Sequence, residues 1–201
     1  MARARRVIVA MVRLWGQDAG AVAWNDARGL GEFEYEPSFL RQRLDIAPLM
    51  MPLRAGVFSF PTLSRDTFHG LPGLLADALP DRFGNRFIDV WLARQGRSPA
   101  DFTPVERLCY MGIRSMGALE FQPPIGPRAE KAIPLEVSEL TRLVNEVLRH
   151  RTQWVVNLKG GRAEALNTII RIGTSAGGNR AKAVIAWNPK TQEVRSGQVA
   201  S

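Results

Sequence analysis

Apolar residues in the first forty positions form short runs that are separated by turn-forming residues. Residues 7–15 and 19–24 are mostly apolar, and residues 31–36 alternate between apolar and charged side chains. Short apolar runs favour β-strands, and alternation with a period of two is typical of a half-buried strand. Turns are expected at residues 16–18 and 25–29, where Gly, Asn and Asp gather. This pattern predicts an antiparallel meander.

The next segment is less regular. Pro37 and Ser38 predict the start of a short helix with Phe39, Leu40 and Leu44 on one side. Residues 49–53 and 56–60 are expected to be extended, and the prolines that interrupt them suit the edge of a sheet.

From residue 70 the apolar spacing becomes helical. Helices are predicted over residues 71–79, 82–94 and 104–111. Asp81 is the expected N-cap of the second helix, which explains it better than a paired carboxylate with Asp77. Thr103 and Glu106 have the spacing of a capping box at the start of the third helix. Residues 117–121 return to a strand pattern.

A proline-rich stretch suggests the domain organisation. Residues 123–127 read Pro-Pro-Ile-Gly-Pro, and they favour a linker because proline and glycine interrupt regular structure. The predicted division is a β-rich subdomain over 1–122, a linker over 123–134 and a further lobe over 135–201. In that lobe we expect an amphipathic helix, a second helix, a glycine-rich loop, and strands over 183–187 and 193–198 that pair. The predicted fold class is α+β.

Composition and charge narrow the possibilities. Hydrophobic residues make up 45% of the 201 residues, which argues against global disorder, and the net charge is +8. Residues 140–201 hold 10 basic and 3 acidic residues. This basic third suits a nucleotide, a nucleic acid or an acidic partner. A solvated basic face is an equally good interpretation.

Several site classes lack the residues that they need. The single cysteine, Cys109, excludes an internal disulfide and is better explained as a core residue than as a nucleophile. His69 and His150 are the only histidines, so neither a metal site nor a Ser-His-Asp triad is predicted. No apolar run reaches membrane-spanning length, because Arg13 ends the N-terminal one. A cytoplasmic protein without a membrane partner is expected.

The candidate chemistry lies in a glycine-rich loop over residues 173–182. Its order is helix, loop, strand, and Asn179 follows Gly178 where a Walker motif requires lysine, so that motif is excluded. Anion binding would use consecutive backbone N–H groups together with Arg180 and Lys182. From these residues alone, a simple glycine turn is the more common alternative.

Three stretches resemble one known family. Ser175-Ala176-Gly177-Gly178-Asn179-Arg180-Ala181-Lys182 is similar to the S-x-(A/G)-G-x-(R/Q)-x-K loop of the HipA family of toxin kinases. Residues 70–81 resemble the family's apolar L-P-x-x-x-x-D-x-L-P-D signature. Residues 112–121, beginning at Gly112, resemble its G-x-x-x-x-G-A-L entry into a strand. The three stretches occur in the family's order.

The resemblance implies a kinase fold that uses ATP and Mg²⁺ to phosphorylate Ser or Thr of a protein substrate. It implies that the following residues help to hold the ATP phosphates: Ser175, Ala176, Gly177, Gly178, Asn179, Arg180 and Lys182. Ser175 is the implied autophosphorylation site. The family's catalytic and metal-binding residues lie downstream of this loop, so no catalytic or metal residue is assigned. We therefore expect the chain alone to be inactive.

The implied partners are a HipB-like DNA-binding antitoxin, through which DNA would be contacted indirectly, or a separate kinase core. Two alternatives stay open. The chain could be a stand-alone regulatory or antitoxin-type subunit of a split HipA-like kinase. A basic nucleic-acid-binding protein is the weaker alternative, since no recognition motif is present.

Overall fold

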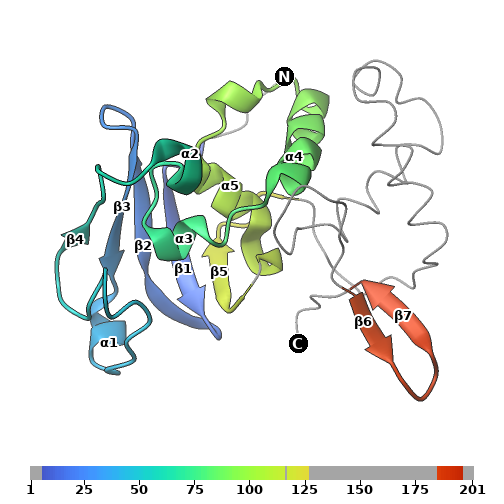
Figure 1. Cartoon of the computed structure of the whole chain (residues 1–201), viewed down its shortest axis with the longest axis horizontal. Helices are drawn as coiled ribbons and strands as arrows, with labels where there is room; N and C mark the ends of the chain where they lie inside the picture. The colour runs from blue at the N-terminus through green and yellow to red at the C-terminus, as the bar shows by residue number, and fades with distance from the viewer. Residues whose placement is uncertain (1–5, 116, 127–184, 197–201) are drawn as a thin grey trace. The chain divides into compact units, whose positions relative to one another are not determined.

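A computed structural model describes residues 6–115, 117–126 and 185–196 (Figure 1). The chain divides into two compact units. The first comprises residues 1–79 and 102–126, and the second comprises residues 80–101 and 127–201. Each unit is described by itself below.

The first unit is built on a five-stranded antiparallel sheet (Figure 1). Its strands are β1 (Val9–Leu14), β2 (Gln17–Asn25), β3 (Leu30–Tyr35), β4 (Val57–Phe58) and β5 (Leu119–Gln122). The order across the sheet is β4-β3-β2-β1-β5. The first three strands form the predicted meander, and β4 pairs with β3 at its edge. β5 returns to pair with the other edge of β1. The prediction of a β-rich α+β fold is thereby confirmed.

The turn between β1 and β2 lies one residue earlier than predicted. Trp15 and Gly16 form it, with φ values of 48° and 76°. Positive φ at both central residues is the mark of a type I′ turn, whose twist matches that of the flanking strands. Gln17 and Asp18 therefore belong to β2, and Gln17 pairs with Leu14.

Short helices connect the strands of this unit. They are α1 (Pro37–Leu40), α2 (Arg65–Phe68), α3 (Gly73–Ala76), α5 (Pro104–Met111) and the 3₁₀ turn η2 (Gly112–Arg114). The helix expected over 71–79 is only four residues long, and it begins two residues late because Gly70 is left-handed and Pro72 precedes the first turn. Leu44 lies beyond α1 and is exposed, so its predicted place on the apolar side of that helix is wrong.

The core of the first unit covers one face of the sheet. Alternate strand residues point into it, as the period of a strand requires. Figure 1 shows α5 beside β1 and β5, and this helix contributes to the same core. The sheet residues of the core cluster are Ala10, Val12, Leu14, Ala19, Val22, Phe33, Tyr35, Phe58, Leu119 and Phe121.

An aromatic group closes the core beside β4. The Tyr35 ring meets Phe33 edge to face at a centroid distance of 4.9 Å and Phe58 at 5.8 Å. The Tyr35 hydroxyl donates a 2.8 Å hydrogen bond to the carbonyl oxygen of Met51. A buried tyrosine needs such a partner for its hydroxyl, and this bond ties the irregular segment after α1 to the sheet.

In the second unit the structure describes residues 80–101 and 185–196. It contains helix α4 (Arg82–Arg94), the 3₁₀ turn η1 (Pro99–Asp101) and a hairpin of β6 (Ile185–Asn188) and β7 (Glu193–Ser196). Asp81 caps α4, because its carboxylate accepts a 2.8 Å hydrogen bond from the backbone N–H of Gly84. The predicted helix over 82–94 and the predicted final hairpin are both confirmed. Among the described helices, none is long and apolar enough to cross a bilayer.

Candidate functional site

The predicted phosphate loop lies outside the described residues. This applies to Ser175, Ala176, Gly177, Gly178, Asn179, Arg180 and Lys182, whose roles stay predictions. Apart from Met116, the other two stretches that carry the resemblance lie in the described part of the chain, and their geometry shows what they do.

The stretch over residues 70–81 begins with a close contact between two loops. Gly70 has φ of 79°, and its carbonyl oxygen accepts a 2.8 Å hydrogen bond from the N–H of Gly31. A β-carbon on Gly70 would lie 2.5 Å from the carbonyl oxygen of Gly29, so only glycine fits here. The Arg65 guanidinium donates to the carbonyl oxygens of Gly29 and Arg28. These bonds fasten the stretch to the β2–β3 turn.

The rest of this stretch has structural tasks. Leu71, Leu75 and Ala78 are buried in the core, whereas Asp77 is exposed at the end of α3. Asp81 caps α4, which confirms capping over a paired carboxylate. The signature therefore supplies core residues and a helix cap. Its described side chains form no reactive group.

The stretch over residues 112–121 turns the chain from α5 into β5. Gly112 ends α5 with φ of 55°, and the Ser115 hydroxyl donates to the carbonyl oxygen of Leu119. Arg114 is buried; it donates a 2.7 Å hydrogen bond to the Tyr110 carbonyl oxygen, and its guanidinium carbon lies 5.1 Å from the Tyr110 ring centroid. Burial lowers the pKa of Arg114. Burial also raises the pKa of Tyr110 to about 12, although the nearby Arg114 acts in the opposite direction.

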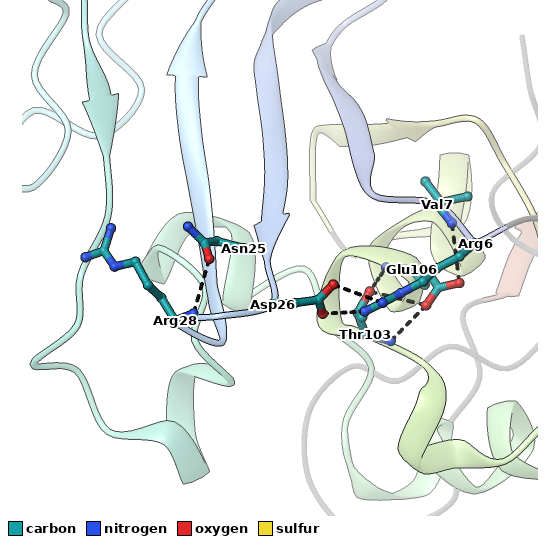
Figure 2. Close-up of polar contacts among 7 residues, drawn as sticks. All are labelled: Arg6, Val7, Asn25, Asp26, Arg28, Thr103 and Glu106. Atoms are coloured by element: carbon teal, nitrogen blue, oxygen red, sulfur yellow. Dashed lines mark hydrogen bonds and ion pairs between the residues drawn. The ribbon is translucent and has the colours of Figure 1, made fainter.

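A buried carboxylate fastens the segment before β1 to α5 (Figure 2). Glu106 accepts hydrogen bonds from the Thr103 N–H at 3.0 Å and from the Val7 N–H at 3.4 Å. In return, the Glu106 N–H donates to the Thr103 hydroxyl at 3.2 Å, which completes the predicted capping box. Arg6 forms an ion pair with Asp26 at 2.6 Å. The sequence carries no signal for the contact to Val7, because a backbone N–H has no residue-specific pattern.

The described side chains offer little chemistry. Burial and then the nearby Glu106 raise the pKa of the Cys109 thiol to about 12, so it is not a nucleophile near neutral pH. This confirms its predicted place in the core. Among residues 6–115, 117–126 and 185–196, no group of His, Cys, Asp and Glu could hold a metal ion.

What the first unit does offer is exposed apolar surface. Leu49 is 93% exposed in the segment before β4, and the neighbouring Met50 and the β4 residue Val57 are also exposed. Nearby, Arg54 stacks on Phe58 with its guanidinium carbon 4.6 Å from the ring centroid. Exposed apolar side chains beside an arginine are typical of surfaces that contact other proteins.

Comparison with known proteins identifies one family. A family model described as the HipA N-terminal domain matches residues 10–122. The match begins in β1, ends at the last residue of β5, and includes both of the stretches described above. No curated protein matches the chain.

Proposed function

Since the chain belongs to the family of the HipA N-terminal domain, we propose that it works as the N-terminal part of a HipA-like serine/threonine protein kinase toxin. The observation that carries the proposal is the family match over residues 10–122. In this proposal the chain supplies the loop that meets the ATP phosphates and a surface for partner proteins. The kinase core supplies the catalytic and metal-binding residues, and the kinase acts in the cytoplasm.

The loop has the donors that phosphate needs. Gly177 and Gly178 have no side chain that would shield their backbone N–H groups, and Arg180 and Lys182 supply positive charge. The loop over residues 173–182 contains no carboxylate, so it offers Mg²⁺ no acidic ligand and suits phosphate oxygens. When bound to ATP, Mg²⁺ neutralises charge on the phosphates during transfer.

Ser175 gives this loop a means of regulation. Phosphorylation would add about −1.5 to −2 charge where the ATP phosphates must approach. The phosphorylated loop would then be repelled from the nucleotide and would pair with Arg180 or Arg171, so activity would fall. In the assembled kinase, Ser175→Asp should lose ATP binding while Ser175→Ala keeps it. Equal ATP binding by both variants and the parent would show that Ser175 only shapes the turn.

The test of the kinase role is phosphate transfer from radiolabelled ATP to a protein substrate, with the chain alone and with its kinase core present. We expect labelling only with the core. Lys182→Ala should lower the rate by about 100-fold, because a charged donor to the transferring phosphate is lost. Lys190→Ala, in the exposed β6–β7 turn, removes the same charge and should leave the rate unchanged. Labelling by the chain alone, or an unchanged rate in Lys182→Ala, would contradict the proposal.

A second candidate is a regulatory or antitoxin-type subunit that docks on a separate kinase core or on a HipB-like DNA-binding antitoxin. The exposed Leu49 and Met50 favour it, because they suit a protein contact. In this case the purified chain should bind the core at equal stoichiometry and inhibit its phosphate transfer. DNA would be contacted through the antitoxin, so DNA binding by the chain alone would argue against this candidate.

A further inference from the structure

The sheet of the first unit has a second face, opposite the core. Side chains of directly paired residues lie on the same face of an antiparallel sheet. Val9 pairs with Ala23 and Met11 with Ala21, and none of these four residues belongs to the core cluster. We call the surface that they occupy the open face.

The centre of the open face is apolar, although one face of such a sheet is commonly solvated and polar. Val9 is 51% exposed, and Met11, Ala21 and Ala23 are half-buried. These residues alternate along each strand with residues of the core. Residues 7–12 and 19–24 are therefore continuous apolar runs. Such runs are typical of strands that are covered on both faces. The composition of β1 and β2 therefore predicts a cover over the open face.

Acidic residues border this apolar centre on both sides. Glu32 and Glu34 of β3 pair with Ala23 and Ala21. On the far side of β1, Gln122 pairs with Met11 and Glu120 pairs with Arg13. Arg28 forms an ion pair with Glu32 at 2.8 Å. Glu34 and Glu120 have no ion pair with any residue that the structure describes. On the same face, the positive charge of Arg13 is balanced by Asp18, with which it forms an ion pair at 2.9 Å. The border therefore attracts cations.

The size of these side chains favours a helix as the cover. Ala21 and Ala23 on β2 are small, and larger side chains stand on the neighbouring strands β1 and β3. Two strand spacings measure about 10 Å, which is close to the diameter of an α-helix. We infer that the open face binds an amphipathic helix of a separate protein. Its apolar stripe would lie on Ala21 and Ala23, and Lys or Arg on its flanks would face Glu34 and Glu120.

This inference goes beyond the proposed function, because it holds whether or not the chain serves a kinase. The probe is a synthetic amphipathic helix of leucine and lysine, with a leucine and glutamate peptide of the same pattern as control. Both are titrated into the full chain carrying ¹³C-labelled alanine methyl groups. The lysine peptide should shift the signals of Ala21 and Ala23. The core alanines Ala10 and Ala19 serve as internal controls, and their signals should stay in place.

Charge reversal tests the acidic border. Glu34→Lys combined with Glu120→Lys should weaken binding of the lysine peptide by about tenfold, since attraction at two positions becomes repulsion. Asp45→Lys combined with Asp66→Lys changes the net charge equally at exposed sites outside the sheet. This control should bind like the parent, and circular dichroism should show both variants folded.

Four results would overturn the inference. The Ala21 and Ala23 signals could stay in place. The glutamate peptide could bind as well as the lysine peptide, or the two double variants could lose binding equally. A shift of the Ala21 signal with protein concentration alone would mean that a second copy of the chain covers the open face. None of these readouts involves ATP, so their failure is separate from failure of the kinase proposal.

Discussion

At the scale of single residues, Glu106 shows how a buried carboxylate is stabilised. Its side chain is fully buried, and a buried charge is costly unless hydrogen bonds replace the lost water. Donors come from two distant parts of the chain, Thr103 and Val7. The residue therefore joins the N-terminal segment to α5 while it caps that helix.

Replacing Glu106 with Gln should destabilise the protein by about 1–3 kcal/mol, because an amide group would face donors that need an acceptor. The free energy of unfolding in urea measures this effect. Glu34→Gln is the matched control, since Glu34 is exposed on β3, and it should change stability by less than about 0.5 kcal/mol. Equal effects of the two substitutions would show that the Glu106 contacts add no stability.

The buried tyrosine hydroxyl and cysteine thiol of the core predict that the protein loses stability at alkaline pH. Burial raises the pKa of Tyr35 from 10.0 and of Cys109 from 9.0, each to about 12. A raised pKa in the folded state favours folding while the group stays protonated, and this contribution disappears as pH rises through the two values. The free energy of unfolding should therefore fall between pH 9 and pH 12. Cys109→Ala should lose less of its stability at the lower end of that range. A flat pH profile would contradict this explanation.

Residue-level features were predictable where they are local. The spacing of Thr103 and Glu106 predicted the capping box, and the position of Asp81 predicted a helix cap, because both contacts span three residues. The ion pair between Arg6 and Asp26 joins residues on different segments. Only the folded sheet brings them together, so no local pattern could reveal it.

At the scale of elements, the β1–β2 turn contains an unusual residue. Type I′ turns favour Asn-Gly, because both central residues need positive φ. Here Trp15 takes the first position with φ of 48°, and its side chain is 71% exposed. The left-handed backbone strains a bulky residue, and the exposed Trp15 side chain gains little burial to offset that strain.

Trp15→Asn should therefore stabilise the protein by about 1 kcal/mol, since asparagine tolerates the left-handed region. The shift of the urea midpoint measures this gain. Gly16→Ala should have the opposite sign, because φ of 76° strains any residue with a β-carbon. Should Trp15→Asn destabilise instead, the indole ring must pack on its surroundings in solution.

The elements that were predicted well are those with regular spacing. The helices over 82–94 and 104–111 have the expected bounds. Both ends of each of the three N-terminal strands lie within two residues of the predicted position. The segment between α1 and β4 was harder, because its shape depends on distant partners. Leu44 follows the helical spacing yet stays exposed, while Met51 is buried through contact with Tyr35.

At the scale of the whole molecule, the first unit is discontinuous in sequence. Residues 102–126 rejoin residues 1–79 after an excursion into the second unit. β5 completes the sheet by pairing Phe121 with Val12. The sequence predicted a strand here but could not name its neighbour, because pairing across such a distance leaves no local pattern. The candidate phosphate loop lies outside the described residues, so its prediction stays untested.

Hydrogen exchange tests whether this unit opens as one. Phe121→Ala removes a fully buried ring and should destabilise the sheet by about 3–5 kcal/mol. Amide exchange in β1 and β2 should then accelerate together with that in β5. Leu49→Ala, at a highly exposed position, should leave exchange unchanged. Acceleration confined to β5 would show that this strand opens independently of the meander.

The late return of β5 has a consequence during synthesis on the ribosome. Met11 pairs with Gln122, and at about 5–20 residues per second the second residue is made about 5–20 s after the first. During that interval the nascent β1 presents an unpaired, apolar edge to its surroundings. Unpaired edges of this kind attract other chains. We therefore expect the newborn protein to bind a chaperone until β5, the last strand of this sheet, has been made.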